Sequence, residues 1–223
     1  RHETVYLVAE KRVIKVEQPG KGDDTRGWGP PFINGESSYF LSINRNKESV
    51  TIDFKQPEGR ELLASLIARA DVLVENFRPG TLDKLWFDYA TLAPRFPRLV
   101  YCSVSGFGQT GPRRKEAGYD AVMQAEGGLM SITGSADGPP YRLGVAIADI
   151  VSGMFAAQGI TAALLARERT GRGQQVDIAM LDSVVALLSY QAGIYFANGV
   201  APPRLGNRHP TIVPYETFRA SDG

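Results

Sequence analysis

Short β-branched segments alternate with helix-like segments along the first half of the chain, and this alternation restricts the folds that the chain can adopt. Residues 57–70 begin with proline and place leucine and isoleucine on one helical face, and residues 81–92 form a weaker helical pattern. The segments with the composition of strands are residues 13–17, 50–54, 71–75 and 99–104. Strands that alternate with helices predict an α/β fold with a Rossmann-like open, mostly parallel sheet flanked by helices.

The second half of the chain is richer in helical patterns. Residues 149–169 predict a long helix of alanine and leucine, which a Thr-Gly-Arg-Gly segment ends. Residues 174–180 predict a strand, and residues 181–197 predict a second apolar helix that ends at Asn198-Gly199. This half therefore adds helices and one further strand to the predicted sheet.

The end of the chain suggests a boundary between domains. Pro202 and Pro203 mark a linker, and residues 211–223 predict a strand and a turn. We therefore expect one large domain over residues 1–200. Residues 201–223 are expected to be a linker and the start of a small domain, at which the chain stops.

Composition argues against several classes of protein. The 223 residues are 43% hydrophobic and 22% charged with a formal net charge of +1, which argues against disorder and against nucleic-acid binding. Cys102 is the single cysteine, and His2 and His209 are the two histidines, so neither an internal disulfide nor a metal site is expected. No run of membrane-spanning length and no signal peptide is recognised. The sequence predicts a soluble intracellular protein that binds no membrane.

Asp149 is an acidic residue in an unusually apolar part of the sequence. It lies between an apolar run and the long apolar helix, where a carboxylate is costly to desolvate unless it is paired or used. An acid near a helix N-terminus also gains from free amides and the helix dipole, so a capping role is the ordinary interpretation. The residue by itself leaves both a capping and a nucleophilic role open.

Other candidates lie in loops. Residues 74–80 follow a strand, and ligands bind at the carboxyl ends of strands in open α/β sheets, although this segment also suits a simple turn. Arg26 lies in a loop that suits either ligand binding or a plain surface. Glu126 precedes two glycines and suits a solvated turn, and Asp120 suits a helix cap. Residues 106–111 resemble a phosphate loop only superficially, because no lysine follows.

Taken in order, these segments resemble the class III CoA-transferases, the family that includes formyl-CoA transferase and carnitine CoA-transferase. The resemblance runs from about Val13 to the last residue and includes Asp149. Its other segments are Val-Ile-Lys-Val-Glu (13–17), Gly-Asp-Asp-Thr-Arg (22–26), Asn-Arg-Asn-Lys (44–47), Val-Glu-Asn-Phe-Arg-Pro-Gly (74–80), Ser-Gly-Phe-Gly-Gln-Thr-Gly-Pro (105–112), Ala-Gly-Tyr-Asp (117–120) and Thr-Gly-Arg-Gly (170–173). Each segment alone is weak, but the ordered set is specific.

The resemblance implies that Asp149 is a covalent nucleophile. Asp149 would attack an acyl-CoA donor to give a mixed anhydride and free CoA thiolate. The thiolate would then form an aspartyl-CoA thioester and release the donor acid, and an acceptor carboxylate would reverse these steps. Covalent steps of this kind divide one difficult exchange into easier ones. CoA and acyl-CoA are then substrates, and no tightly bound cofactor is expected.

The resemblance also assigns binding residues and a partner. It places Asn76, Phe77 and Thr81 at the CoA moiety and Tyr119 beside the acyl site. The family's N-terminal CoA-anchoring turn of small residues is not recognised in residues 1–12. Family members form interlocked dimers, so the implied partner is a second copy of the chain. The expected location is the cytoplasm or, in a eukaryote, the mitochondrial matrix.

Within the family, residues 22–31 and 206–215 look closest to the branch of transferases that acts on succinyl-CoA and dicarboxylates. The arginine guanidinium group can form a bidentate ion pair with a carboxylate. The candidate substrate contacts are Arg26, Arg45 and Arg208, with Glu126 as a further one.

Two other functions stay open. The α-methylacyl-CoA racemases share this fold and the aspartate, but they have a histidine where this chain has Tyr119, and an ordinary tyrosine is a poor base at neutral pH. A catalytically inactive CoA-binding chain would bind CoA without turnover. A nicotinamide-dependent dehydrogenase is disfavoured, because no Gly-x-Gly-x-x-Gly segment follows a strand.

Overall fold

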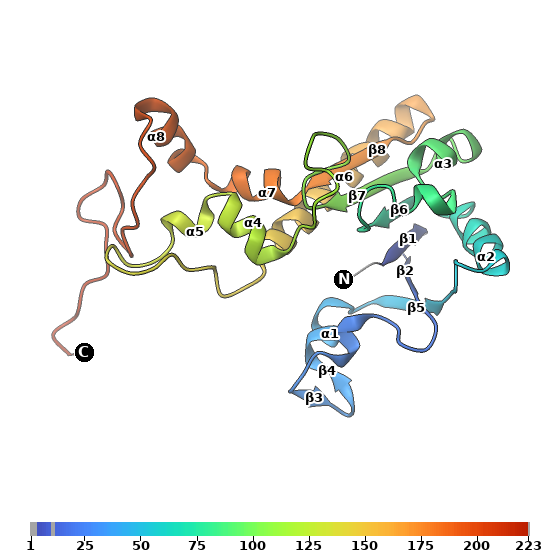
Figure 1. The fold of residues 1–223 in the computed structure, drawn as a ribbon, viewed down its shortest axis with the longest axis horizontal. Helices are drawn as coiled ribbons and strands as arrows, with labels where there is room; N and C mark the ends of the chain where they lie inside the picture. The colour runs from blue at the N-terminus through green and yellow to red at the C-terminus, as the bar shows by residue number, and fades with distance from the viewer. Residues whose placement is uncertain (1–3, 10–11, 223) are drawn as a thin grey trace. The chain divides into compact units, whose positions relative to one another are not determined.

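The computed structural model describes residues 4–9 and 12–222, which group into two compact units (Figure 1). The sheet unit comprises Arg1–Ala117 and Phe155–Ile178, and the helical unit comprises Gly118–Met154 and Ala179–Gly223. This division does not coincide with the boundary predicted at residue 200, which stays a prediction. Of the predicted N-terminal departure from the family, residues 1–3, 10 and 11 lie outside the described residues.

The sheet unit is built on a six-stranded sheet in the order β5-β2-β1-β6-β7-β8. Its strands are β1 (Val5–Ala9), β2 (Arg12–Glu17), β5 (Lys47–Thr51), β6 (Val72–Glu75), β7 (Val100–Ser105) and β8 (Gln175–Ala179). β2 pairs with β5 and β6 pairs with β7 in parallel, whereas β1 is antiparallel to both β2 and β6. The carboxyl ends of β2, β5, β6 and β7 therefore meet at one edge, where β1 begins.

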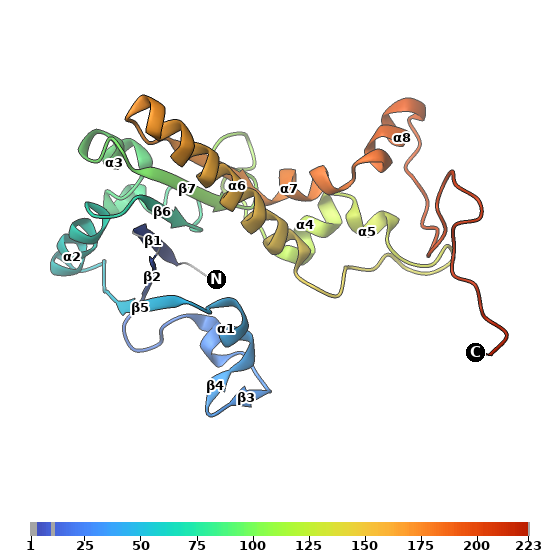
Figure 2. The ribbon, with the colours of Figure 1, turned by 180° about the vertical axis from the view of Figure 1, so that it is seen from behind.

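Helices cover both faces of this sheet, which confirms the predicted α/β fold. Alternation along β6 and β7 sends side chains to opposite faces. Leu73 and Tyr101 join the core cluster under α2 (Pro57–Ile67) and α3 (Tyr89–Arg95). Val72 and Val100 on the other face contact Ala163 of α6 (Ile147–Thr170), the long helix in front of the strands in Figure 2.

Several predicted boundaries in the sheet unit were wrong. The strand predicted at 50–54 is β5 at Lys47–Thr51, an edge strand whose polar side chains hide the strand pattern. The helix predicted at 81–92 divides into the 3-10 helix η2 (Asp83–Leu85) and α3, because Trp86 between them has a left-handed backbone. The strand β1 was not predicted.

The loop that connects β2 with β5 contains short elements only. They are the 3-10 helix η1 (Asp24–Gly27), the hairpin strands β3 (Phe32–Ile33) and β4 (Glu36–Ser37), and the helix α1 (Ser38–Ile43).

A buried charge network fixes the start of this loop to β2. The Glu17 carboxylate accepts two hydrogen bonds from Arg26, from Nε and from one terminal nitrogen, each at 2.8 Å. It also accepts from the Ser49 hydroxyl of β5 and from the Asp23 amide, each at 2.7 Å. The Lys15 ammonium forms an ion pair with Asp23, and both side chains are almost fully buried. These bonds hold the loop against the carboxyl ends of β2 and β5.

The helical unit contains α4 (Asp120–Glu126), α5 (Leu129–Ile132), α7 (Met180–Leu187), α8 (Tyr190–Asn198) and the first turns of α6. The single helix predicted at 181–197 was wrong, because Ser189 has a positive φ of 48° and the two helices meet at a bend of 82°. Residues 211–222 contain no strand, contrary to the prediction, and their side chains are exposed.

The expectation that no segment reaches membrane-spanning length was wrong for α6. By length and composition, this 24-residue helix is long and apolar enough to cross a membrane. Helices that pack on a sheet meet the same criterion, and α6 contacts β6 and β7 through Ala163. Near its end the Arg167 guanidinium is buried and donates to the Asp71 carboxylate at 2.8 Å and to the Arg98 carbonyl at 3.0 Å.

We expect Gly127→Ala to destabilise the helical unit by about 1–3 kcal/mol. A Cβ at Gly127 would lie 2.6 Å from Cγ1 of Val184, a fully buried residue of α7. Gly193→Ala in α8 is the matched control, because a Cβ there meets nothing within 4 Å. Urea denaturation followed by circular dichroism compares the two variants. Equal stability would contradict close packing of α4 on α7.

The Glu17 network predicts a loss of stability in acid. Its bonds lower the pKa of Glu17 from 4.5 to about 2, the contact with Arg26 being the largest cause. A lowered carboxyl pKa contributes stability that is complete above pH 4.5 and is lost as the pH falls towards 2. We expect Glu17→Gln to cost about 2 kcal/mol at neutral pH, and the difference from wild type to shrink over this window. A difference in unfolding free energy that does not change between pH 7 and pH 3 would refute this account.

Candidate functional site

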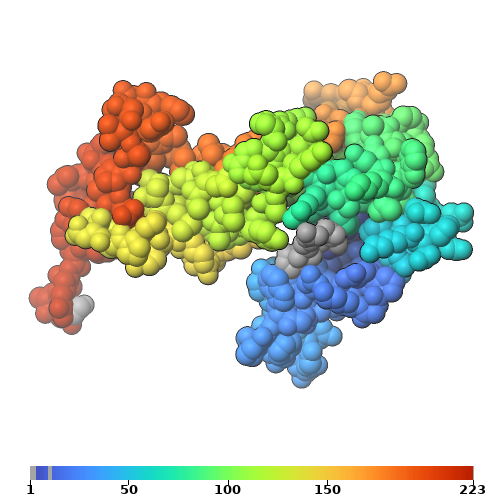
Figure 3. Space-filling view, in the orientation of Figure 1, coloured from blue at the N-terminus to red at the C-terminus, as the bar shows by residue number. Residues whose placement is uncertain are grey.

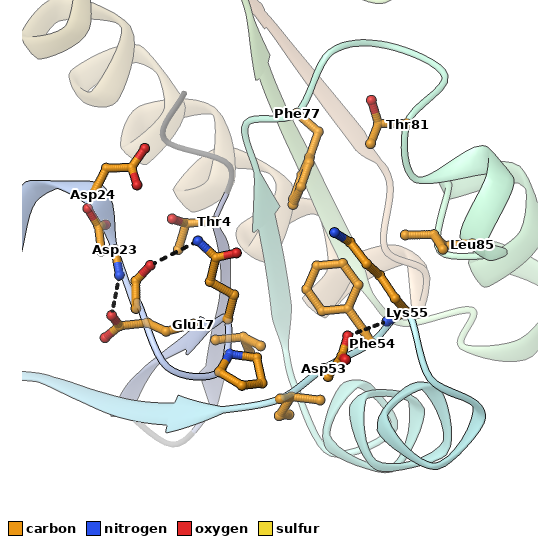
Figure 4. A pocket seen from close by; sticks show the side chains of 15 residues that line it. Thr4, Glu17, Asp23, Asp24, Asp53, Phe54, Lys55, Phe77, Thr81 and Leu85 are labelled. Atoms are coloured by element: carbon orange, nitrogen blue, oxygen red, sulfur yellow. Dashed lines mark hydrogen bonds between the residues drawn. The ribbon is translucent and has the colours of Figure 1, made fainter.

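A pocket of about 340 Å³ opens in the sheet unit where β2, β5 and β6 end and β1 begins (Figure 4). This is the edge at which open α/β sheets bind ligands. The loop after β2 and the segment that leads into α2 both line it, and their surfaces adjoin in the space-filling view (Figure 3). The lining residues used below are Thr4, Glu17, Asp23, Asp24, Asp53, Phe54, Lys55, Phe77 and Thr81.

The acidic side chains of the pocket are held by partners within the protein. Figure 4 shows Glu17, Asp23 and Asp24 on one side of the pocket. Glu17 is bound by Arg26 and Asp23 by Lys15, as described above, and Asp24 forms an ion pair with Lys21 at 2.6 Å. These cations offset the negative charge that the acids would otherwise present to an anionic ligand.

Among the described residues that line the pocket, Lys55 is the cation, and it lies on the side opposite these acids. It lies on the turn between β5 and α2, where its amide donates to the Asp53 carboxylate at 3.1 Å. Gly59 lets this turn approach α2, because a Cβ there would lie 1.9 Å from the Asp53 carbonyl oxygen. Sequence reasoning missed Asp53, Phe54 and Lys55, since the strand was predicted to extend through residue 54. Their position at the carboxyl end of a strand was the signal that could have found them.

The turn after β6 provides the aromatic wall of the pocket. Phe77 is buried and packs edge-on against Phe54, with ring centroids 6.2 Å apart. Its amide donates to the Glu75 carboxylate at 2.8 Å, and the Thr81 amide closes the next turn by donating to the Arg78 carbonyl at 3.0 Å. The structure thus brings Phe77 and Thr81 together in one pocket, while Asn76 is exposed on the same turn.

Glu75 also lines a second, smaller pocket of about 200 Å³ in the sheet unit. Glu75 is 5% exposed, and burial raises its pKa from 4.5 to about 7. Hydrogen bonds from Ser103 and from the Phe77 amide oppose this rise, and the negative charges of Asp177 and Asp83 add to it. A carboxyl group with a pKa raised in this way keeps its proton closer to neutral pH than an ordinary glutamate does.

Asp149 lies in the helical unit, in the first turn of α6, with an exposed side chain. The Ala148 amide next to it donates to the Asp120 carboxylate at 2.9 Å. Gln124, which is fully buried, donates to the same carboxylate at 2.9 Å and accepts from the Leu143 amide at 2.9 Å. Asp120 therefore caps α6 from α4, and this network holds the turn that presents Asp149 to solvent.

The remaining predicted residues divide between the two units. Tyr119 is 54% exposed immediately before α4, and Glu126 is an exposed residue at the end of α4. Arg208 is exposed in the segment after α8, and Arg45 is exposed between α1 and β5. Arg26 is engaged by Glu17, so a substrate contact would require it to leave that carboxylate.

Known proteins resemble this chain over most of its length. It is 49% identical over 211 residues to a succinyl-CoA:glutarate CoA-transferase of Mus musculus, covering 95% of this chain and 48% of that protein. It is 47% identical over 220 residues to an acetyl-CoA:oxalate CoA-transferase of Acetobacter aceti, covering 98% of this chain and 56% of that protein. The chain therefore spans about half the length of these relatives.

A solved structure also resembles this chain over most of its length. The crystal structure of a CaiB/BaiF family protein from Brucella suis superposes with a TM-score of 0.88 at 50% identity, covering 94% of this chain and 56% of that one. The model of CoA-transferase family III matches residues 11–223. With the fold, the edge pocket and these matches together, the chain belongs to CoA-transferase family III.

Proposed function

We propose that the protein transfers CoA from an acyl-CoA to a carboxylic acid, with Asp149 as the nucleophile. The observation that carries this proposal is an exposed carboxylate on a helix whose start is capped by another residue, Asp120. Because Asp120 accepts the Ala148 amide, Asp149 lies exposed in the first turn of α6, where the helix dipole stabilises an anionic carboxylate. Two relatives are named as CoA-transferases, one for succinyl-CoA and glutarate and one for acetyl-CoA and oxalate, and these names support CoA transfer as the reaction class.

The edge pocket is the proposed site for the CoA moiety. Phe77 and Phe54 offer apolar surface, Thr81 offers a hydroxyl group, and Lys55 offers a cation to a phosphate group. The acids on the opposite side are already paired, which lowers the repulsion that the anionic CoA would meet. No tightly bound cofactor enters the proposal.

In the proposed reaction, Asp149 attacks the thioester carbonyl of the donor and expels the CoA thiolate, which leaves a mixed anhydride on the protein. The thiolate attacks the carbonyl carbon of Asp149, which releases the donor acid and forms an aspartyl-CoA thioester. The acceptor carboxylate attacks the carbonyl carbon of that thioester, which expels the CoA thiolate and forms a second mixed anhydride. The thiolate then attacks the carbonyl carbon of the acceptor, which gives the new acyl-CoA and frees Asp149. Each step exchanges one acyl bond for another, so no oxidant or net proton is required.

The substrate class and the assembly belong to the same proposal. We propose a dicarboxylic acid as one of the two acids, by analogy with the named relatives. Arg208 is the arginine that we favour for its distal carboxylate, because Arg208 is exposed and lies in the same unit as Asp149, whereas Arg26 is held by Glu17. The family resemblance supports an interlocked homodimer.

Trapping of an acyl-enzyme tests the role of Asp149. After incubation with succinyl-CoA and hydroxylamine, peptide mass spectrometry should find a hydroxamate on the peptide that contains Asp149. We expect Asp149→Asn to abolish the hydroxamate and lower the transfer rate by roughly a thousand-fold or more, since the nucleophile is lost. Asp137→Asn, a change of an exposed loop acid in the same unit, is the control. An unmodified peptide together with deuterium exchange at the α-carbon of a 2-methylacyl-CoA would favour a racemase instead.

Binding of CoA tests the pocket. We expect Lys55→Ala to raise the dissociation constant of CoA roughly ten-fold, because a charge-assisted contact to phosphate is lost, and to weaken its dependence on salt. Isothermal titration calorimetry at two salt concentrations measures both effects. Lys115→Ala, at an exposed position outside the pocket, is the control. An unchanged CoA affinity in Lys55→Ala would place the phosphate groups elsewhere.

A further inference from the structure

Glu75 occupies a junction between the sheet and the proposed CoA pocket. It is the last residue of β6, and its register partner in the parallel strand β7 is Ser103, which is 1% exposed. The carboxylate accepts from the Phe77 amide two residues ahead, and it is also hydrogen-bonded to Ser103. One buried side chain therefore ties the turn after β6 to the neighbouring strand.

This tie sets the position of the pocket's aromatic wall. The turn must bring the Phe77 backbone to within 2.8 Å of the Glu75 carboxylate, and the Phe77 ring then packs against Phe54. Without an acceptor at Glu75, the Phe77 amide would be left without this bond in a buried setting, which is costly. The turn would then move to find another partner.

We propose that Glu75 is a positioning residue for CoA binding, whose carboxyl group holds the Phe77 turn in the binding conformation more firmly when it is ionised. This inference rests on the proposed function. An ionised carboxylate offers two strong acceptors, to the Phe77 amide and to Ser103, whereas a protonated one commits one oxygen to its own proton. Deprotonation of Glu75 therefore strengthens CoA binding, and bound CoA in turn favours the ionised form.

The charged surroundings of Glu75 decide where this change occurs. Asp83 of η2 and Asp177 of β8 repel the carboxylate, and Asp88, Tyr101 and Arg78 line the same small pocket. Burial is the main cause that raises the pKa of Glu75 to about 7, and the negative charges of Asp177 and Asp83 add to it. The affinity for CoA should therefore rise as the pH increases through neutrality.

Folding stability responds with the opposite sign. A carboxyl group whose pKa is raised in the folded protein binds its proton more tightly there than in the unfolded chain, so its contribution to stability falls as the pH rises from about 4.5 to about 7. Tighter CoA binding together with lower stability over one pH range is a combination that a purely structural residue would not produce.

The test is calorimetric titration of CoA into the full chain at pH 6, 7 and 8, with Glu75→Gln, Glu75→Ala and the exposed control Glu61→Gln. Glutamine keeps an acceptor for the Phe77 amide but cannot ionise. We expect Glu75→Ala to weaken CoA binding roughly ten-fold and Glu75→Gln to restore most of that loss at pH 6. The ratio of the Glu75→Gln dissociation constant to the wild-type dissociation constant should grow several-fold from pH 6 to pH 8. Because CoA titrates equally in both measurements, the ratio removes the effect of CoA's own protonation.

The outcomes separate the two proposals. A wild-type chain that binds no CoA overturns the proposed function and this inference with it. CoA affinity that is equal in wild type and Glu75→Ala, or a Glu75→Gln ratio that does not change with pH, overturns the inference alone. If Glu75→Ala does not fold, the pH dependence of the Glu75→Gln ratio decides the matter by itself.

Discussion

The ion pair between Glu17 and Arg26 is the interaction on which the edge of the sheet depends. Four hydrogen bonds converge on the Glu17 carboxylate, from Arg26, from Ser49 of the neighbouring strand and from the amide of Asp23. They close the loop after β2 over the carboxyl ends of β2 and β5. A buried charge is tolerated only when it is paired and hydrogen-bonded. The hydrogen bonds of the Glu17 carboxylate therefore hold in place the loop that forms one wall of the edge pocket.

The proposed chemistry divides between parts of the molecule with different physical character. The sheet unit supplies a pocket whose described lining includes apolar walls, the cation Lys55 and the ion-paired acids Glu17 and Asp23, which suits retention of a large anionic substrate. The helical unit supplies an exposed acid whose helix is capped from elsewhere. Rigid placement of the turn before Asp149 comes from the buried amide of Gln124, which satisfies Asp120 and the Leu143 amide together.

Local pattern was sufficient for the buried strands and for helices with a clear apolar period. The apolar runs that became β6 and β7 were predicted within one residue, and α2 and α6 were recognised from their period. It failed where exposure removes the pattern, as in the edge strand β5, or where one backbone angle breaks a regular sequence, as at Trp86 and Ser189. Of the predicted site residues, Phe77 and Thr81 meet in a pocket, but Lys55 was missed because the preceding strand was placed too late.

The sequence by itself determined the α/β class, the family and the candidate nucleophile, because ordered motifs and hydrophobic period are local properties of the chain. Only the tertiary structure decided which groups are paired. Arg26 was a candidate for substrate binding, but the structure shows it bound by Glu17. Glu75 was one residue of a predicted strand, and its burial in the fold raises its pKa to about 7. Charge pairing and desolvation depend on neighbours that are distant in sequence, so they follow from the packed fold and not from the order of residues.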